Sequence, residues 1–328
     1  METLYPIKFE PIYKDYIWGG TKLSDKLNKK TPSNIVKCAE SWEISSIEDN
    51  ISVVSNGFLA GNNLQEVIEV YMGDILGDKI FEKFGDEFPL LIKLIDATDT
   101  LSIQVHPDNK TAKERHHAFG KTEMWYIMDS EPNSQIITGF KGKISKDIYQ
   151  KHLKDNTLKD ILNVEQAKKD EIYFLPAGRI HAIGKGIMLA EIQQTSDITY
   201  RIHDWNRVDK DGKPRELHPE LALDVIDFNQ YDSYKITKPL RNNETAELVG
   251  SDFFIVNRLQ FNKSIEKDYH LLDSFVIYLC VEGAFTIIYG EGKTETLSKG
   301  ETVLIPADLK ELTLEPIKSA MILEIFIK

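Results

Sequence analysis

Short runs in which apolar and polar residues alternate recur along most of this chain, and a period of two indicates β-strands. This alternation, together with apolar runs such as 88–97 and 170–175, predicts strands over residues 38–45, 88–97, 101–106, 121–128, 170–175, 186–207, 276–280, 284–289, 302–305 and 320–327. In the first of these strands, Glu40, Trp42 and Ile44 are expected to share one face. Apolar residues at helical spacing predict one or two short helices within 64–84, and a helix, a break and a second helix within 146–167. The polar segment 109–119 and the segment 215–228 are also expected to be helical. We therefore expect a mainly β fold with a few inserted helices.

Two of the predicted strands carry side chains that can bind a metal ion. Gln104 and His106 lie two residues apart on one strand, so their side chains point to the same face. On the next strand, Glu123 shares a face with Lys121 and Trp125. If the two strands lie side by side, the carboxylate approaches the amide and the imidazole. These groups alone make an incomplete set of ligands.

A further candidate ligand follows in the segment 170–184. Its apolar strand ends at Pro176, the chain turns through Ala177 and Gly178, and His181 comes near the start of the next strand. Imidazole and carboxylate groups suit Zn²⁺ or, less selectively, Mn²⁺ and Fe²⁺, and a glutamine carbonyl adds a harder oxygen donor. The expected metal ligands are Gln104, His106, Glu123 and His181.

A structural role is the alternative for each of these residues. A single histidine on a strand is more often a hydrogen-bonded structural residue than a ligand. The combination favours the metal site, because two alternating strands carry polar groups on the face where a half-buried strand normally has Val or Ile.

Lys93 lies in the middle of the apolar strand FPLLIKLIDA. A lysine in such a strand is costly unless its ammonium group reaches water, a carboxylate or an anionic ligand. Extension of the long side chain to the surface and burial beside a charged partner are both compatible with the pattern.

The stretch 186–207 has one strongly polar face, which either meets bulk solvent or lines a wet cavity. Its position directly after His181 favours the cavity. Arg201 lies on this stretch, and its guanidinium group can bind phosphate or stabilise an oxyanion. The alternative is a salt bridge to a nearby carboxylate, namely Asp197, Asp204 or Glu191.

Composition restricts the partners and the compartment. The 328 residues exceed one typical domain, and 52 acidic against 40 basic residues give a net charge of -12, which argues against nucleic acid or an anionic membrane as a partner. The two cysteines, Cys38 and Cys280, are too few for a disulfide framework or a cysteine zinc site. We find no signal-peptide core and no apolar run long enough to cross a bilayer, so we expect a cytoplasmic protein.

The C-terminal part contains an internal echo of the segment that holds His181. DEIYFLPAGRIHAI aligns without gaps on GETVLIPADLKELT, so that the two prolines coincide and His181 matches Glu311. We expect two related β-barrel modules, of which only the first keeps the metal. The expected domains are a metal-binding catalytic domain with helical insertions over 1–235 and a degenerate second domain without metal ligands over 236–328.

Several segments resemble a known family. PAGRIH resembles the second cupin motif, and Gln104-x-His106 followed by Glu123 resembles a variant of the first; cupins are jelly-roll barrels. More narrowly, seven blocks are similar, in the same order, to class I mannose-6-phosphate isomerase in its short bacterial form. They are YIWGG at Tyr16, CAESWEIS at Cys38, FPLLIKLIDA at Phe88, LSIQVHPD at Leu101, GKTEMWYI at Gly120, PAGRIHAIGKGI at Pro176 and EIQQTSDITYRIHDWNR at Glu191.

The resemblance implies two tandem cupin barrels and one Zn²⁺ per chain, held by the four ligands named above. It implies an aldose–ketose isomerase that interconverts mannose 6-phosphate and fructose 6-phosphate through a cis-enediol. Arg201 is the expected catalytic residue. The expected substrate-binding residues are Lys93, Ser102, Lys121 and Glu191.

The resemblance leaves the general base open among Glu191, Lys121, His203 and a metal-bound water. The expected partner is a small sugar phosphate, with no nucleic acid or membrane, for a monomer or homodimer. Alternatives are a cupin that binds a sugar phosphate without catalysis, a cupin isomerase of another sugar, and a metal-dependent oxygenase. The oxygenase is disfavoured because such sites usually have more histidines.

Overall fold

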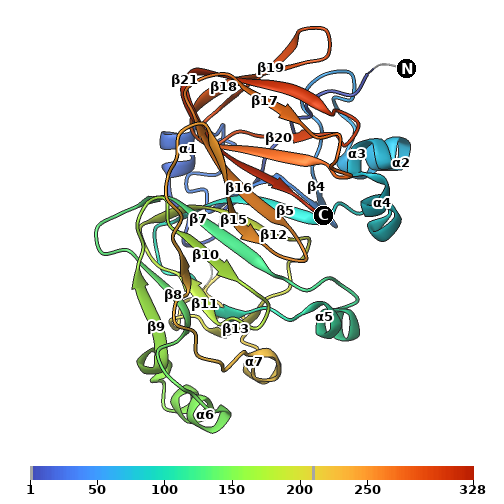
Figure 1. The fold of residues 1–328 in the computed structure, drawn as a ribbon. Helices are drawn as coiled ribbons and strands as arrows, with labels where there is room; N and C mark the ends of the chain where they lie inside the picture. The colour runs from blue at the N-terminus through green and yellow to red at the C-terminus, as the bar shows by residue number, and fades with distance from the viewer. Residues whose placement is uncertain (1–2, 209–210) are drawn as a thin grey trace.

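Strands dominate the computed structural model, which describes residues 3–208 and 211–328 (Figure 1). Most of them belong to three large sheets. The mainly β fold predicted from the alternating pattern is therefore confirmed. Within the described ranges, we find no helix that is both long enough and apolar enough to span a membrane.

The first two sheets lie face to face and share a core of buried residues. Across the first sheet the strand order is β1 (Ile12–Lys14), β2 (Glu40–Ile44), β5 (Leu90–Ala97), β12 (Ile187–Gln194), β7 (Glu123–Ser130), β10 (Ile172–Leu175) and β14 (Lys235–Ile236). Across the second sheet it is β13 (Tyr200–His203), β6 (Ile103–Val105), β11 (His181–Ile183), β8 (Gln135–Phe140) and β9 (Leu162–Gln166).

The C-terminal part of the chain forms the third sheet. Its order is β15 (Glu244–Gly250), β16 (Ile255–Phe261), β21 (Glu311–Phe326), β18 (Val276–Tyr289) and β19 (Lys293–Ser298), with β17 (Ile265–Asp268) on β21 and β20 (Thr302–Ile305) on β18. A separate short pair joins β3 (Ser46–Ile47) to β4 (Asn50–Ile51). The helices are α1 (Lys22–Leu27), α2 (Leu64–Tyr71), α3 (Gly73–Leu76), α4 (Asp78–Phe84), α5 (Asn109–His116), α6 (Lys146–Lys154), the 3₁₀ helix η1 (Leu158–Ile161) and α7 (Pro219–Val225).

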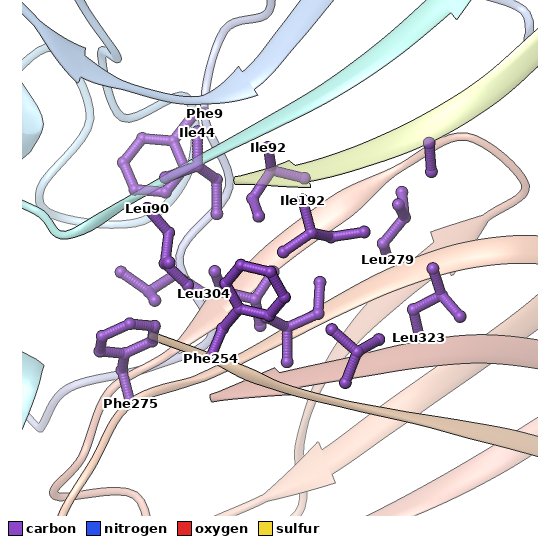
Figure 2. Packing of buried hydrophobic residues seen from close by; sticks show 14 of the residues in the cluster. Phe9, Ile44, Leu90, Ile92, Ile192, Phe254, Phe275, Leu279, Leu304 and Leu323 are labelled. Carbon is purple, nitrogen blue, oxygen red and sulfur yellow. The ribbon is translucent and has the colours of Figure 1, made fainter. Parts of the chain in front are cut away.

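Side chains of the first sheet alternate between two environments. On its outer face, Ile92 and Ile192 pack in one apolar core with Leu279 and Leu323 of the third sheet, as Figure 2 shows. Its inner face turns toward the second sheet. Because both faces of the sheet are covered, β5 and β12 are buried at every position. This burial explains why the residues on either side of Lys93 in β5 are apolar whichever face they point to.

A bulge in β2 changes one prediction about which side chains share a face. Glu40, Trp42 and Ile44 have the two-residue spacing of one face, but the pairing of β2 with β5 shifts register between Trp42 and Ile44. Ile44 therefore joins the outer core, whereas Glu40 and Trp42 line a cavity on the inner side. The prediction of one common face was wrong because a bulge adds a residue that the alternation does not reveal.

The segment 146–167 is helical only in its first half. α6 ends at Lys154, Asn156 adopts a left-handed conformation with φ of 56°, and the chain continues through η1 into strand β9. The second predicted helix was wrong because Leu162–Gln166 pairs with β8 at the edge of the second sheet. Hydrogen bonds of that pairing outweigh the helical spacing of the apolar residues.

Three other predicted strands differ from the observed ones in where they are continuous. The polar stretch 186–207 is divided between β12 in the first sheet and β13 in the second. Conversely, the predicted strands 276–280 and 284–289 form the single strand β18, which is bent at two register shifts against β21. Strand breaks thus depend on pairing partners that the local pattern does not contain.

The predicted helices at 64–84 and 109–119 are confirmed, and their first residues explain where they begin. Asn63 accepts a hydrogen bond from the Glu66 amide, and the Glu66 carboxylate accepts one from the Asn63 amide, which forms a capping box at the start of α2. Asp108 accepts from the Thr111 amide in the same way at the start of α5.

The predicted domain division at residues 235 and 236 stays a prediction. The third sheet begins at Glu244, while β14 still pairs with β10 of the first sheet. The N-terminal segment crosses between the parts, since Ile7 forms a bridge with Leu304 of β20.

We expect Leu323→Ala to destabilise the protein by about 2–5 kcal/mol, because it removes a fully buried side chain between the first and third sheets. Ile317→Ala is the matched control in the same strand, since Ile317 is 65% exposed, and it should change stability by less than about 0.5 kcal/mol. Urea unfolding measures both. Equal losses would contradict the packing described for this core.

Candidate functional site

The predicted ligands come from opposite walls of the space between the first two sheets. On the second sheet, His181 of β11 pairs in register with Gln104 of β6, and Gln104 pairs in turn with Arg201 of β13. Residues in register point their side chains to the same face. These three side chains therefore form one row, and Glu123 approaches it from β7 of the first sheet.

Three of the four predicted ligands meet at one point. Glu123 Oε1 lies 3.2 Å from His181 Nε2, and Glu123 Oε2 lies 3.6 Å from His106 Nε2. The ligand atoms of these three residues all lie within 4.8 Å of one another, and residues 3–208 and 211–328 hold no second group of this kind. Gln104 Nε2 lies 3.3 Å from His181 Nε2, and a half-turn of the amide would bring its oxygen to that position.

Backbone carbonyls orient both imidazoles. His106 Nδ1 lies 2.8 Å from the Ile198 carbonyl oxygen, and His181 Nδ1 lies 2.8 Å from the Arg179 carbonyl oxygen. When Nδ1 donates its proton to a carbonyl, Nε2 keeps a free lone pair, which is the form that binds a metal. Both Nε2 atoms point toward Glu123.

Gly178 brings the two histidine segments together. Its φ is 87°, its amide donates to the His106 carbonyl at 2.9 Å, and a Cβ atom there would lie 2.8 Å from the Val225 carbonyl oxygen. Only glycine combines this conformation with so close an approach of backbone. The glycine of the PAGRIH segment therefore holds the turn that delivers His181 next to His106.

Burial controls the charge states in the cluster. Burial lowers the pKa of His181 to about 4, and burial together with Lys121 lowers the pKa of His106 well below its usual value. Both imidazoles are therefore neutral at neutral pH. Burial and the nearby charge of Glu191 raise the pKa of Glu123. This carboxylate is stable in its charged form only when additional positive charge compensates it.

The unpaired atoms of the cluster fit a cation. Both carboxylate oxygens of Glu123 and Nε2 of His106 are buried without a hydrogen-bond partner among the described residues. Such atoms are costly in a protein interior unless something binds them. Two imidazole nitrogens, a carboxylate and an amide oxygen form a donor set for Zn²⁺, Mn²⁺ or Fe²⁺. The residues present could therefore hold a divalent metal ion.

A cavity of about 650 Å³ opens beside the cluster. This volume is within the usual range for a small-molecule site. Gln104 links the cavity to the cluster, because it lines the cavity and contacts His181. The cavity also brings together the predicted catalytic and substrate-binding residues, namely Lys93, Ser102, Lys121, Glu191 and Arg201.

Lys93 lies between two carboxylates and does not reach the surface. Its Nζ lies 3.2 Å from Glu191 Oε1 and 3.8 Å from Glu40 Oε2, and Lys93 is 6% exposed. Burial alone would lower the pKa of Lys93, but Glu191 and Glu40 outweigh burial and raise it. Burial alone would raise the pKa of Glu191, but Lys93 and Lys121 lower it, and the Trp125 indole donates to its second oxygen at 2.8 Å.

Sequence reasoning missed several residues of the cavity wall. Glu40 accepts a hydrogen bond from the Trp42 indole at 2.7 Å, and both side chains line the cavity. The feature of the sequence that could have identified this pair is a glutamate two residues before a tryptophan, on a strand whose residues are all buried. The YIWGG stretch at Tyr16 contributes to the same wall. Other lining residues that were not predicted as part of a site include Tyr16, Ile17, Trp18, Asp197, Thr199 and Arg215.

Arg201 faces the cavity, and no carboxylate of the described chain pairs with it. Its Nη1 donates to the Glu216 carbonyl oxygen at 3.0 Å, and its buried Nε has no partner there. Asp204, one of the alternative partners, instead accepts hydrogen bonds from Arg207 and Arg215. The guanidinium group is therefore held at the cavity wall with hydrogen-bonding capacity to spare.

The structure separates the candidates for the general base. Glu191 and Lys121 line the cavity, whereas His203 does not belong to its lining. The His203 ring packs edge-on against Trp205, with 4.9 Å between ring centroids. His203 is therefore a weaker candidate than Glu191 or Lys121.

The internal echo corresponds to similar elements in the two halves. His181 begins β11 after β10, and Glu311 begins β21 after β20. His181 is buried beside Glu123, whereas Glu311 is exposed. The metal-ligand group of the described chain belongs to the first half only.

Comparison with known proteins gives consistent matches. Residues 7–144 match the catalytic domain of phosphomannose isomerase type I, and residues 244–323 match the mannose-6-phosphate isomerase cupin domain. The chain is 34% identical over 299 residues to a mannose-6-phosphate isomerase of Streptococcus mutans, covering 90% of each chain. It is 32% identical over 317 residues to mannose-6-phosphate isomerase ManA of Bacillus subtilis, covering 95% of this chain and 96% of the relative.

The three-dimensional fold also matches that of a known structure. The crystal structure of a Bacillus subtilis mannose 6-phosphate isomerase superposes with a TM-score of 0.87 and 33% identity, covering 98% of this chain and 99% of that one. The cupin fold expected from the resemblance is confirmed. This chain therefore belongs to the type I mannose-6-phosphate isomerase family and is an enzyme of that family.

Proposed function

We propose that this chain interconverts mannose 6-phosphate and fructose 6-phosphate with one Zn²⁺ held by Gln104, His106, Glu123 and His181. The observation that carries the proposal is a group of buried ligand atoms without hydrogen-bond partners among the described residues, next to a cavity whose lining includes lysine and arginine side chains. The relatives in Streptococcus mutans and Bacillus subtilis are named as mannose-6-phosphate isomerases, which supports the choice of substrate.

Charge in and around the cavity supports an anionic substrate. Three buried carboxylates and two buried ammonium groups leave one excess negative charge, which a divalent cation would reverse to one positive charge. These groups are Glu40, Glu123, Glu191, Lys93 and Lys121. Arg201 adds a further positive charge at the wall. A phosphate group is therefore attracted to the loaded site, and sugar without phosphate lacks this attraction.

Arg201 is the proposed catalytic residue for charge stabilisation. It is the cross-strand neighbour of Gln104, so it lies beside the metal-ligand group rather than at the far end of the cavity. A bound zinc ion would act as a Lewis acid toward negative charge on the substrate oxygens O1 and O2. The Arg201 guanidinium is positioned to stabilise the same developing charge by hydrogen bonds.

Glu191 is the proposed general base. Isomerisation moves a proton between C2 and C1 of the sugar through a cis-enediol, while the hydroxyl proton moves between O2 and O1. Glu191 lines the cavity, and Lys93 and Lys121 keep its carboxylate ionised. It can therefore take the proton from C2 of mannose 6-phosphate and return it to C1. Lys121, Lys93 and Ser102 are proposed to orient the sugar phosphate from the surrounding wall.

We expect the Zn²⁺-loaded protein to turn over mannose 6-phosphate in a coupled assay for fructose 6-phosphate. A chelator should abolish turnover, added Zn²⁺ should restore it, and His181→Ala should lower kcat/KM by about 100-fold or more because a ligand is lost. Turnover that survives chelation would exclude the metal. A metal-replete protein that binds sugar phosphates without converting them would favour the non-catalytic alternative.

We expect Glu191→Gln to lower kcat by about 10²–10⁴-fold with a small change in KM, because it removes the proton acceptor. Glu324→Gln is the matched control, since Glu324 is also buried and paired with a lysine, Lys267, at 2.7 Å, but lies in the third sheet. It should lose stability and keep its kcat. Similar kcat values for Glu191→Gln and wild type would rule out Glu191 as the base.

We expect Arg201→Ala to lower kcat/KM by about 100-fold, the usual scale for loss of one charge-stabilising donor. Arg241→Ala, at an exposed position paired with Glu244, should behave as wild type. Steady-state kinetics on folded variants, verified by circular dichroism, measure both. If Arg201→Ala retained wild-type kcat/KM, Arg201 would have no part in catalysis.

A further inference from the structure

Thr138 carries a hydroxyl group that is fully buried and has no hydrogen-bond partner among the described residues. It lies on β8 and pairs in register with His181 of β11. The row of His181, Gln104 and Arg201 on the second sheet therefore continues to Thr138. Because Thr138 does not line the substrate cavity, its hydroxyl group is not placed to contact the sugar.

Neighbouring residues establish which way Thr138 points. Ile136, two residues before it, packs with Ile183 in the core between the first two sheets. Ile137 packs in a different core on the outside of the second sheet. Since side chains alternate along a strand, Thr138 points inward with Ile136, to the side on which Glu123 meets His181.

Glu123 presents a complementary atom on that side. Its Oε2 has the ammonium group of Lys121 at 3.3 Å, whereas its Oε1 lies against His181 Nε2 at 3.2 Å. Both oxygens lack a hydrogen-bond partner among the described residues. An ionised carboxylate only accepts hydrogen bonds, and a threonine hydroxyl can donate one. The two buried groups are therefore matched in chemistry but are not joined directly.

We propose that Thr138 is a positioning residue of the metal centre, whose hydroxyl donates through one buried water to Oε1 of Glu123. The proposal rests on the metal site described under the proposed function. A water in such a place needs two or more polar partners, and these two groups supply them. The resulting hydrogen bond keeps the Glu123 carboxylate turned toward the two imidazoles. Hydrogen bonds of this type to ligating side chains commonly control metal affinity.

The choice of threonine over valine supports this role. Both side chains are β-branched, have nearly the same shape and suit a strand. A buried hydroxyl without a partner is less stable than a methyl group in the same place. Beside a buried carboxylate, by contrast, a hydroxyl donor is more favourable than a methyl group, so threonine suits this position on the side of Glu123.

The test compares Zn²⁺ affinity, measured by competition with a chromophoric chelator, for wild type, Thr138→Val and Thr138→Ser. We expect Thr138→Val to bind Zn²⁺ about 10- to 100-fold more weakly and Thr138→Ser to bind within about threefold of wild type. The metal-free Thr138→Val protein should melt at the same temperature as wild type or higher, because an unpaired hydroxyl has been removed.

Thr302→Val is the matched control. Thr302 Oγ1 is also buried without a partner among the described residues, but it lies on β20 in the third sheet. This variant should keep wild-type Zn²⁺ affinity. Wild-type affinity in Thr138→Val, or an equal loss in Thr138→Ser, would overturn the role of the hydroxyl while leaving the metal site intact. A wild-type protein that binds no Zn²⁺ would instead overturn the metal site itself.

Discussion

A carboxylate sealed away from water is the constraint on which this site depends. Glu123 has no exposed surface, and within the described residues the ammonium group of Lys121 forms an ion pair with its second oxygen. Desolvation of a charge in such a place is offset only by opposite charge held at short range. Lys121, the neighbouring Lys93 and the cation that the two neutral imidazoles could help to hold are sources of such charge.

The first sheet helps to keep water away from the site because its two faces pack in two different cores. In β12, Ile192 faces the third sheet, and the adjacent Glu191 faces the cavity between the first two sheets. The third sheet therefore keeps water from the back of the strand that carries the proposed base. The third sheet, in which the described residues form no metal-ligand group, thus covers the first sheet from behind, and exclusion of water strengthens the charge interactions on the other side.

Residues whose relation is local were predictable from sequence. Gln104 and His106 share a strand face at a spacing of two. In the PAGRIH segment, the glycine indicates the turn that precedes His181. Other features depend on distant partners. The bulge after Trp42 is visible only in the pairing of β2 with β5, and the carboxylates that hold Lys93 come from two other strands. Thr138 escaped notice because an inward threonine on an apolar strand looks like any β-branched residue.

The alternation in β12 also limits how the chain can change in length. A strand that gains or loses one residue turns every following side chain to the opposite face. A single deletion before Glu191 would press its charge into the apolar core against the third sheet and place Ile192 in the cavity. Substitutions in this strand alter one side at a time, whereas an insertion or deletion damages both. Within β12, the gain or loss of one residue is therefore expected to be more damaging than in the loops that flank this strand.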